Sequence, residues 1–257
     1  MKQRSHSTTR LLIQTVLTLT LAASAHAQSS ETSRAGRTTN LKLDHFWSYI
    51  ISREETQQPA VTATLRDQFQ TVTVSIGTPL QFLNPAQKTI DSVVTTIVDL
   101  NDHLTMYNLQ NPALLPTSQT LTATNQFGAR QLTVDRATTI MVPTQKETLR
   151  LPRRLDHFLC YPVNGQSIAQ PATLSDQFQT QDVIVEQPAL FCNPVQKTIG
   201  NDTTRIQNEA AHLLCYNIRL PQSTTSRQVH IKNQLEEDLF TLTTTQMLCV
   251  PSTKTVP

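Results

Sequence analysis

The chain has 257 residues, with 21 lysine and arginine residues against 19 aspartate and glutamate residues. This near balance gives no electrostatic case for nucleic acid or an anionic membrane as a partner. Only five glycines occur in the whole sequence, which argues against glycine-rich loops that cradle phosphates.

The first 27 residues have the three parts of a secretory signal peptide. Three basic residues precede a short apolar run over 11–23, and Ala-His-Ala at 25–27 fits the small-x-small cleavage pattern. The apolar run is too short to be a stable membrane anchor. We therefore expect a secreted protein, extracellular or periplasmic, that does not span the membrane once the signal is removed. Its removal leaves 18 basic residues (21 less 3) against 19 acidic ones.

The next segment, residues 28–40, is polar and has no apolar periodicity, so we predict a disordered leader. Residues 41–257 are long enough for two ordinary small domains. Threonine is abundant there and favours strands, and few segments have the pattern of a long helix. The composition therefore predicts an all-β fold.

A unit of about 55 residues occurs four times after the leader. Each unit holds a triplet, called the anchor here, of Asp or Asn, then Gln, then Phe or Leu. Apolar residues at every second position on both sides of the anchor are typical of two strands with one buried face. An Asp or Asn between them suits a turn, so each anchor predicts a β-hairpin. Units 1 to 4 are numbered by their anchors, which begin at Asp67, Asn125, Asp176 and Asn233.

Every unit also has a His–Tyr pair before the anchor and a Pro–Lys pair after it. A residue that recurs in all four units is more typical of scaffold than of a catalytic site. We expect each His to bond nearby backbone and each Lys to be exposed. The alternatives are a His–metal or general-base site in one unit only, and a repeated contact of the lysines with an anionic glycan. The His–Tyr pairs are His45 with Tyr49, His103 with Tyr107, His157 with Tyr161, and His212 with Tyr216; the lysines are Lys88, Lys146, Lys197 and Lys254.

The unit pattern predicts three or four short strands per unit. We expect two tandem β-sandwich or barrel-like domains of two units each, at 41–147 and 153–257. The segment "ETLRLPRR" between them has the character of a short linker.

All four cysteines lie in the second predicted domain, at 160, 192, 215 and 249. An even number of cysteines in an exported chain predicts disulfides rather than a zinc site, for which a C-x-x-C knuckle is missing. We favour Cys160 with Cys192 and Cys215 with Cys249, because these pairs are equivalent by repeat. Cys160 with Cys249 and Cys192 with Cys215 remains open. The first domain has Ser48, Leu83, Met106 and Met141 at the four matching positions, and its Leu and Met residues can fill the space with apolar contacts.

The pattern H-x-x-C-Y, D-Q-F, C-x-P-x-x-K resembles an uncharacterised repeat family of secreted bacterial proteins. The match is fullest in unit 3, from His157 to Lys197, and unit 1 departs from it at both cysteine positions. Glycine often follows the Phe in that family, but here only Gly128 does. The resemblance implies export and a bacterial source, and it implies no activity.

Sequence motifs for catalysis are missing. Asp precedes three of the four repeated histidines, but neighbouring side chains on a strand point to opposite faces. No G-x-S-x-G or H-E-x-x-H motif occurs, and we expect no cofactor and no metal. The acidic run "LEEDL" at 235–239 is interpreted as a solvated hairpin end, and the single tryptophan, Trp47, as part of the core.

These observations predict a non-enzymatic binding or structural module. The recognition residues are expected in unrepeated loops at 52–60, 108–118 and 217–227. The partner class we expect is an envelope glycan or protein. The alternative is a secreted hydrolase with its site at the interface of the two domains.

Overall fold

The computed structural model describes residues 43–53, 59–220 and 226–256. The expected signal peptide and leader lie outside the described residues, as do the centres of the loops at 52–60 and 217–227. The described residues contain no helix, so none of their segments is a helix that could cross a membrane.

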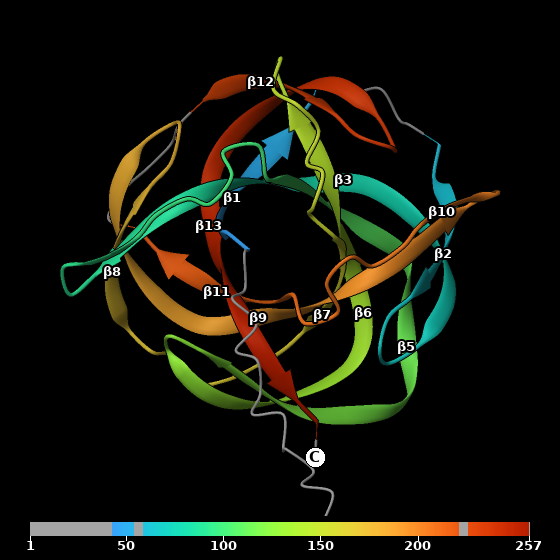
Figure 1. The fold of residues 1–257 in the computed structure, drawn as a ribbon, viewed down its shortest axis with the longest axis horizontal. Helices are drawn as coiled ribbons and strands as arrows, with labels where there is room; N and C mark the ends of the chain where they lie inside the picture. Colours follow the sequence, from blue (N-terminus) through green and yellow to red (C-terminus); the bar gives the residue numbers. More distant parts are fainter. Residues whose placement is uncertain (1–42, 54–58, 221–225, 257) are drawn as a thin grey trace, which may run out of the picture. The chain divides into compact units, whose positions relative to one another are not determined.

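The described part of the chain forms strands that pair antiparallel throughout, so the all-β prediction is confirmed. Figure 1 shows them running around a common centre. The thirteen strands are β1 (His45–Ser52), β2 (Val61–Arg66), β3 (Thr71–Ile90), β4 (Val93–Thr95), β5 (His103–Asn125), β6 (Gly128–Lys146), β7 (His157–Pro162), β8 (Gln170–Ser175), β9 (Thr180–Ile199), β10 (Asp202–Thr204), β11 (His212–Arg219), β12 (Arg227–Lys232) and β13 (Glu237–Thr255).

The hairpin predicted at each anchor is present. In unit 1, β2 and β3 pair from Val61 opposite Ile76 to Arg66 opposite Thr71. Their alternating apolar residues, Ala63 and Leu65 among them, are buried on one face, as the period-two pattern requires.

The prediction of several short strands per unit is wrong in one respect. The strand after the anchor runs on through the Pro–Lys segment as one strand of 19 or 20 residues in β3, β6, β9 and β13. In β3, β9 and β13 the first part pairs within the hairpin and the second part pairs with other strands, whereas β6 pairs with β5 along both parts. The pairing of β3 with β5 shifts register between Ile76 and Gln81, and such bulges bend a strand enough to serve two neighbours.

The strands of the two predicted domains belong to one sheet, and the structure shows no split of the described residues into two domains. β2 of unit 1 pairs with β9 of unit 3, β6 of unit 2 pairs with β7, and the first strand β1 pairs with the last strand β13. All described residues also lie in one compact unit. The repeated halves are therefore joined along many strand edges.

The buried apolar residues form two clusters. The larger one contains Trp47, which is fully buried, as the sequence predicts for it. The smaller one collects the cysteine positions of the four units: the four cysteines pack with Leu83, Met106 and Met141. In units 1 and 2, apolar side chains thus fill the positions that the disulfides fill in units 3 and 4.

Candidate binding surface

Each anchor Asp or Asn first closes its own hairpin turn. Asp67 Oδ1 accepts hydrogen bonds from the backbone N–H groups of Phe69 (2.9 Å) and Gln70 (3.0 Å). Asp176 makes the same two contacts in unit 3, with Phe178 and Gln179. One side-chain oxygen is therefore committed to local structure, as expected for an Asx turn.

The second polar atom of each anchor side chain reaches the repeated Tyr two units away. Tyr161 donates to Asp67 Oδ2 (2.8 Å) and Tyr49 donates to Asp176 Oδ2 (2.7 Å). Units 2 and 4 are joined in the same way, by Asn125 with Tyr216 (3.0 Å) and Asn233 with Tyr107 (2.7 Å). All four contacts connect one half of the chain to the other.

The four repeated lysines lie against the anchor of the next unit. The Nζ atoms of Lys146 and Lys254 stand 4.7 Å and 4.5 Å from the ring centres of Phe178 and Phe69. The expectation that these lysines are exposed is wrong for Lys88, Lys146 and Lys197, which are 3%, 4% and 2% exposed. A long apolar stem can lie in the sheet while the amine meets an aromatic face or an amide.

Burial lowers the pKa of the repeated lysines and histidines. Desolvation lowers the pKa of Lys88, Lys146, Lys197 and Lys254 to about 8. Desolvation, followed by the charge of the lysine in the same unit, lowers the pKa of His45 to about 4 and of His103, His157 and His212 to about 3. The four histidines are thus neutral at physiological pH.

The expected backbone hydrogen bonds of the histidines are present in one unit only. His103 Nδ1 contacts the carbonyl of Asn101 at 2.9 Å. His45 and His157 instead meet the anchor Gln of the next unit, Gln126 and Gln234. The expectation is wrong for these two and for His212, whose Nδ1 has no partner among the described residues and whose ring centre lies 5.7 Å from that of Phe191.

The Asp residues that precede the histidines point elsewhere. Asp44 accepts the N–H groups of Val98 (2.6 Å) and Asp99 (2.9 Å), and Asp156 accepts those of Gln207 (2.8 Å) and Asn208 (2.9 Å). Within the described residues, none of the four repeated histidines is bonded to a carboxylate. The described part of the chain therefore supplies no His–carboxylate pair from the repeat.

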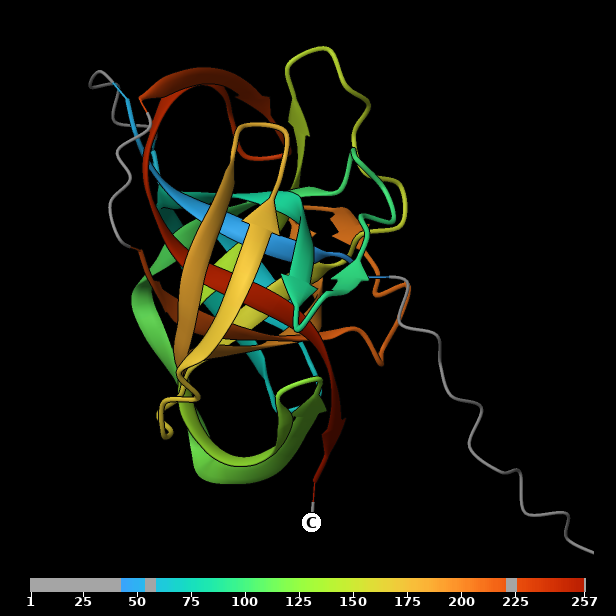
Figure 2. The same ribbon diagram turned by 90° about the vertical axis from the view of Figure 1, so that its left-hand side faces the viewer.

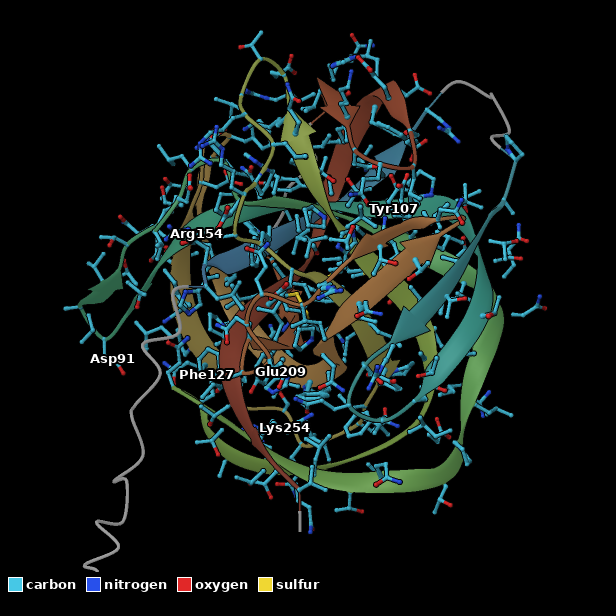
Figure 3. All side chains as sticks on the ribbon, turned by 45° about the vertical axis from the view of Figure 1, so that its right-hand side comes forward. Asp91, Tyr107, Phe127, Arg154, Glu209 and Lys254 are labelled. Atoms are coloured by element: carbon cyan, nitrogen blue, oxygen red, sulfur yellow. A yellow bond between two sulfur atoms is a disulfide. The ribbon has the colours of Figure 1, made fainter. Side chains whose placement is uncertain are left out.

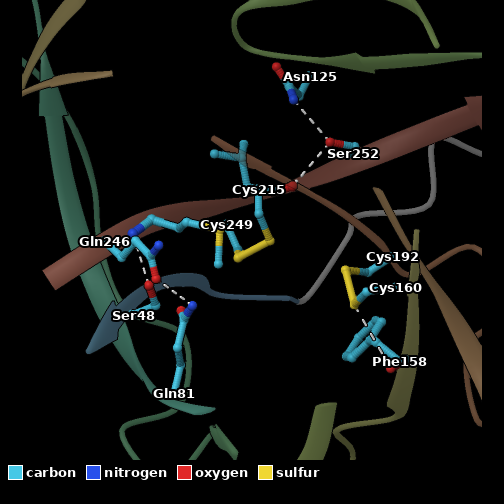
Figure 4. The surroundings of a disulfide bond; sticks show 12 residues. Ser48, Gln81, Asn125, Phe158, Cys160, Cys192, Cys215, Gln246, Cys249 and Ser252 are labelled. Atoms are coloured by element: carbon cyan, nitrogen blue, oxygen red, sulfur yellow. Dashed lines mark hydrogen bonds between the residues drawn. A yellow bond between two sulfur atoms is a disulfide. The ribbon is translucent and has the colours of Figure 1, made fainter. Parts of the chain in front are cut away.

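Two disulfides staple directly opposed residues on neighbouring strands (Figure 4). The structure joins Cys160 to Cys192 and Cys215 to Cys249, which is the pairing favoured by the repeat. Both pairs are fully buried. Two disulfides indicate an oxidising, extracytoplasmic setting.

We expect replacement of Cys215 and Cys249 by Met to cost less stability than replacement by Ala. In unit 2, Met106 and Met141 stand opposite each other at the same two positions and fill the same cluster. Both double variants lose the Cys215–Cys249 cross-link, which should lower the free energy of unfolding by about 3–4 kcal/mol in the loop-entropy model. The alanine variant also leaves a cavity, which lowers it further. Urea unfolding of both double variants measures the difference, and peptide mapping without reductant checks the pairing. Equal losses would show that the methionine positions are not packing substitutes.

The acidic run at 235–239 is not wholly solvated, so that interpretation is wrong for its first acid. Glu236 is 8% exposed and forms an ion pair with Arg53. Arg53 also reaches Asp238 at 3.3 Å and lies over the ring of Phe240. This acid joins unit 4 to the end of β1, and a distant arginine cannot be recognised from the local acidic pattern.

Two hairpins project from equivalent places in units 1 and 3. Residues 88–95 of β3 and β4 form the first, and residues 197–204 of β9 and β10 form the second. Figure 1 shows them on opposite sides of the view, and Figure 3 shows Asp91 at the far end of the first. Residues 91–100 and 200–209 have the same order of exposed and half-buried positions.

The exposed chemistry of these two segments differs. The first carries Val93, Val94, Val98 and Leu100, which are 69%, 52%, 60% and 54% exposed. The second has Asp202, Thr203, Gln207 and Glu209 at the matching positions. Exposed apolar residues gathered on one segment often mark a recognition surface.

Two hollows flank the first hairpin, which Figure 2 shows beside the β8–β9 hairpin. One, of about 820 Å³, is lined by Thr89, Asp91 and Ser92 together with residues of β8, β9 and β11. The other, of about 540 Å³, is lined by Lys88 and Ile90 from the hairpin and by Gln126, Phe127 and Arg130 from unit 2. Both volumes are in the range of small-ligand sites. We call the hairpin and its two hollows the hairpin surface.

This surface lies outside the segments at 52–60, 108–118 and 217–227, where the sequence predicts recognition loops; residues 108–118 belong to strand β5. A signal was present: "VVTTIVDL" at 93–100 is apolar where the equivalent "DTTRIQNE" at 202–209 is polar. Aligned repeats that keep their scaffold residues and differ at exposed ones locate variable surfaces.

Comparison with known proteins gives a family without a function. A family model described as a repeat of unknown function (DUF7450) matches residues 116–251, more than half of the chain. The matched range spans the boundary expected between two domains at 147–153. No curated protein and no solved structure matches the chain. The chain belongs to the DUF7450 family of repeats of unknown function.

Proposed function

We propose that this protein is a secreted, non-enzymatic module that binds an envelope glycan through the hairpin surface. The observation that carries the proposal is the contrast between the two projecting hairpins. They share backbone position and exposure, but at positions 93, 94, 98 and 100 the first presents exposed apolar side chains where the second has polar ones. The first also adjoins the two hollows described above.

The contacts of the repeated residues favour a binding role over hydrolysis. The anchors, tyrosines, lysines and most histidines have contacts within the scaffold. The repeated histidines are neutral and buried, and none of them meets a carboxylate in the described part of the chain. In this proposal the halves 41–147 and 153–257 are copies within one scaffold, and the scaffold holds the hairpin in place.

The chemistry of the hairpin surface favours a sugar over a flat protein face. Glycans present hydroxyl groups at ring edges and apolar C–H groups on ring faces. The smaller hollow offers amides from Gln126 and Gln170 beside the apolar side chains of Ile90 and Phe127. A hollow with a few polar groups among apolar ones is typical of small-ligand sites.

Exchange of the hairpin chemistry tests the proposal. The double substitution Val93→Asp with Val94→Thr gives the hairpin at 88–95 the residues that the hairpin at 197–204 has at its two matching positions. We expect it to weaken binding of the mature protein to purified insoluble peptidoglycan by about tenfold or more, a change of about 1.4 kcal/mol. Binding is measured by co-sedimentation over a range of glycan concentrations.

The chain offers its own control, because Asp202→Val with Thr203→Val makes the reverse exchange in the hairpin at 197–204. This variant should bind as the unaltered protein does. Equal binding by all three proteins would refute the hairpin surface as the recognition site. Capture of a secreted protein, with no binding to the glycan, would favour a protein partner.

A further inference from the structure

Lys88 differs from the other three repeated lysines, which have either an amide acceptor or carboxylates close to the amine. Lys197 donates to Gln234, and Lys254 donates to Gln68 and to Asn193 (3.0 Å). Lys146 lies over Phe178 at 4.7 Å, close to the negative charges of Asp176 and Glu147.

Lys88 is 3% exposed, and no described residue accepts a hydrogen bond from it or forms an ion pair with it. Its nearest ring, that of Phe127, has its centre 6.0 Å away. The equivalent of Gln234 at this junction is Gln126, whose amide contacts His45 at 3.2 Å instead. Lys88 lines the smaller hollow.

A second cation with a free donor lines the same hollow. Arg130 Nε is buried and has no hydrogen-bond partner among the described residues, although the side chain of Arg130 also bonds Tyr216. Five residues after the anchor, where unit 2 has Arg130, units 1, 3 and 4 have Val72, Gln181 and Asp238. This pair of cations is therefore peculiar to the junction of units 1 and 2.

Buried donors without acceptors are costly, and the cost is larger for charged groups. Arg130 Nε is such a donor, and together with Lys88 it gives the hollow more positive than negative charge, because Asp91 is the one acid in its lining. An anionic group that enters the hollow would supply the missing acceptors. Arg and Lys are the usual partners of carboxylate and phosphate groups.

We infer that the hollow beside Lys88 and Arg130 binds an anionic sugar, with the acidic group on the two cations. This site rests on the proposed glycan-binding function and names its ligand class. The carboxylate or phosphate oxygens accept from Lys88 Nζ and Arg130 Nε, and sugar hydroxyls meet the amides of Gln126 and Gln170. The apolar ring face lies against Ile90 and Phe127.

Calorimetric titration of the mature protein with glucuronate, glucose 6-phosphate and glucose tests the inference. We expect saturable binding of at least one anionic sugar and at least tenfold weaker binding of glucose. Preference for glucuronate identifies a carboxylate ligand, and preference for the phosphate a phosphorylated one. Lys88→Met and Arg130→Val, which introduces the unit 1 residue, should each weaken binding by tenfold or more.

Lys197→Met is the matched control, since it removes the equivalent lysine from a junction where that lysine has an acceptor. It should lower the thermal midpoint and leave sugar binding unchanged. Lys88→Met should keep or raise the midpoint, because it removes an unpartnered buried cation. Equal binding of glucose and the anionic sugars, undiminished binding by Lys88→Met, or no binding of any of the three sugars would overturn the site.

The outcomes also separate this site from the broader proposal. Hairpin-dependent binding of peptidoglycan by the Lys88→Met variant at full strength would overturn the anionic-sugar site and leave the glycan-binding function standing. Lysine-dependent binding of an anionic sugar without any binding of peptidoglycan would support the site and refute the choice of glycan.

Discussion

Residues 153–257 expressed alone are expected to be unfolded, whereas a full chain cleaved within residues 148–152 should stay folded as two associated fragments. Every Tyr–anchor contact joins one half to the other, as between Tyr49 and Asp176. Strand pairs such as β1 with β13 and β2 with β9 also cross between the halves. A separate half would expose these strand edges and bury too little apolar surface to offset its chain entropy.

A protease site inserted at 148–152 provides the measurement. After cleavage, the fragments should elute together in size-exclusion chromatography and keep the circular dichroism of the uncut protein. Both disulfides lie inside the second half, so no covalent bond would hold the fragments together. A cooperative unfolding transition of 153–257 by itself would show that this half is an independent domain.

The substitution Asp67→Ala is expected to lower the free energy of unfolding by about 3–4 kcal/mol. The carboxylate accepts from two backbone N–H groups through one oxygen and from Tyr161 and Asn193 through the other. Alanine removes all four hydrogen bonds and leaves their donors, among them the fully buried Tyr161 and Asn193, without this acceptor. Urea unfolding can be followed by the fluorescence of the single, fully buried Trp47.

The conservative change Asp67→Asn is the informative control. In unit 2 the anchor is an asparagine, Asn125, which closes its own turn and also contacts Tyr216 of unit 4. An asparagine can therefore make the same two connections. We expect an intermediate loss, because the new amide would face the amide of Asn193. The exposed Asp135→Ala should change stability by less than about 0.5 kcal/mol. A similarly small loss for Asp67→Ala would refute the connecting role of the anchor.

The local structure could be predicted because its signal is local. Apolar alternation within nine residues of each anchor is enough to indicate a hairpin, and an Asp or Asn between the strands indicates the turn. Repeat symmetry favoured the observed disulfide pairing but also allowed Cys160 with Cys249 and Cys192 with Cys215. The structure shows the opposition of these positions in every unit, since Ser48 lies opposite Leu83 and Met106 opposite Met141.

The long-range contacts could not be predicted for a physical reason. Each of the four tyrosines could satisfy any of the four anchors, so the chemistry does not say that Tyr49 reaches Asp176, 127 residues away. The burial of Lys197 depends on an acceptor from the next unit, and a lone lysine is ordinarily at the surface. The pair of Lys88 and Arg130 depends on the same unforeseen neighbour relation.

The contacts between each repeated lysine and the next anchor limit how many repeat units the fold can contain. The lysines of units 1 to 3 meet the anchors of units 2 to 4, and Lys254 of unit 4 returns to the anchor of unit 1. Open solenoids need special terminal repeats to cover their ends, and they tolerate added copies. Here the last unit contacts the first, so neither needs a terminal capping repeat, and the number of units that the closed set of contacts can hold is fixed at four. A fifth unit inserted in frame would have no place in the circuit, whereas a circular permutant that begins at residue 153 keeps every contact.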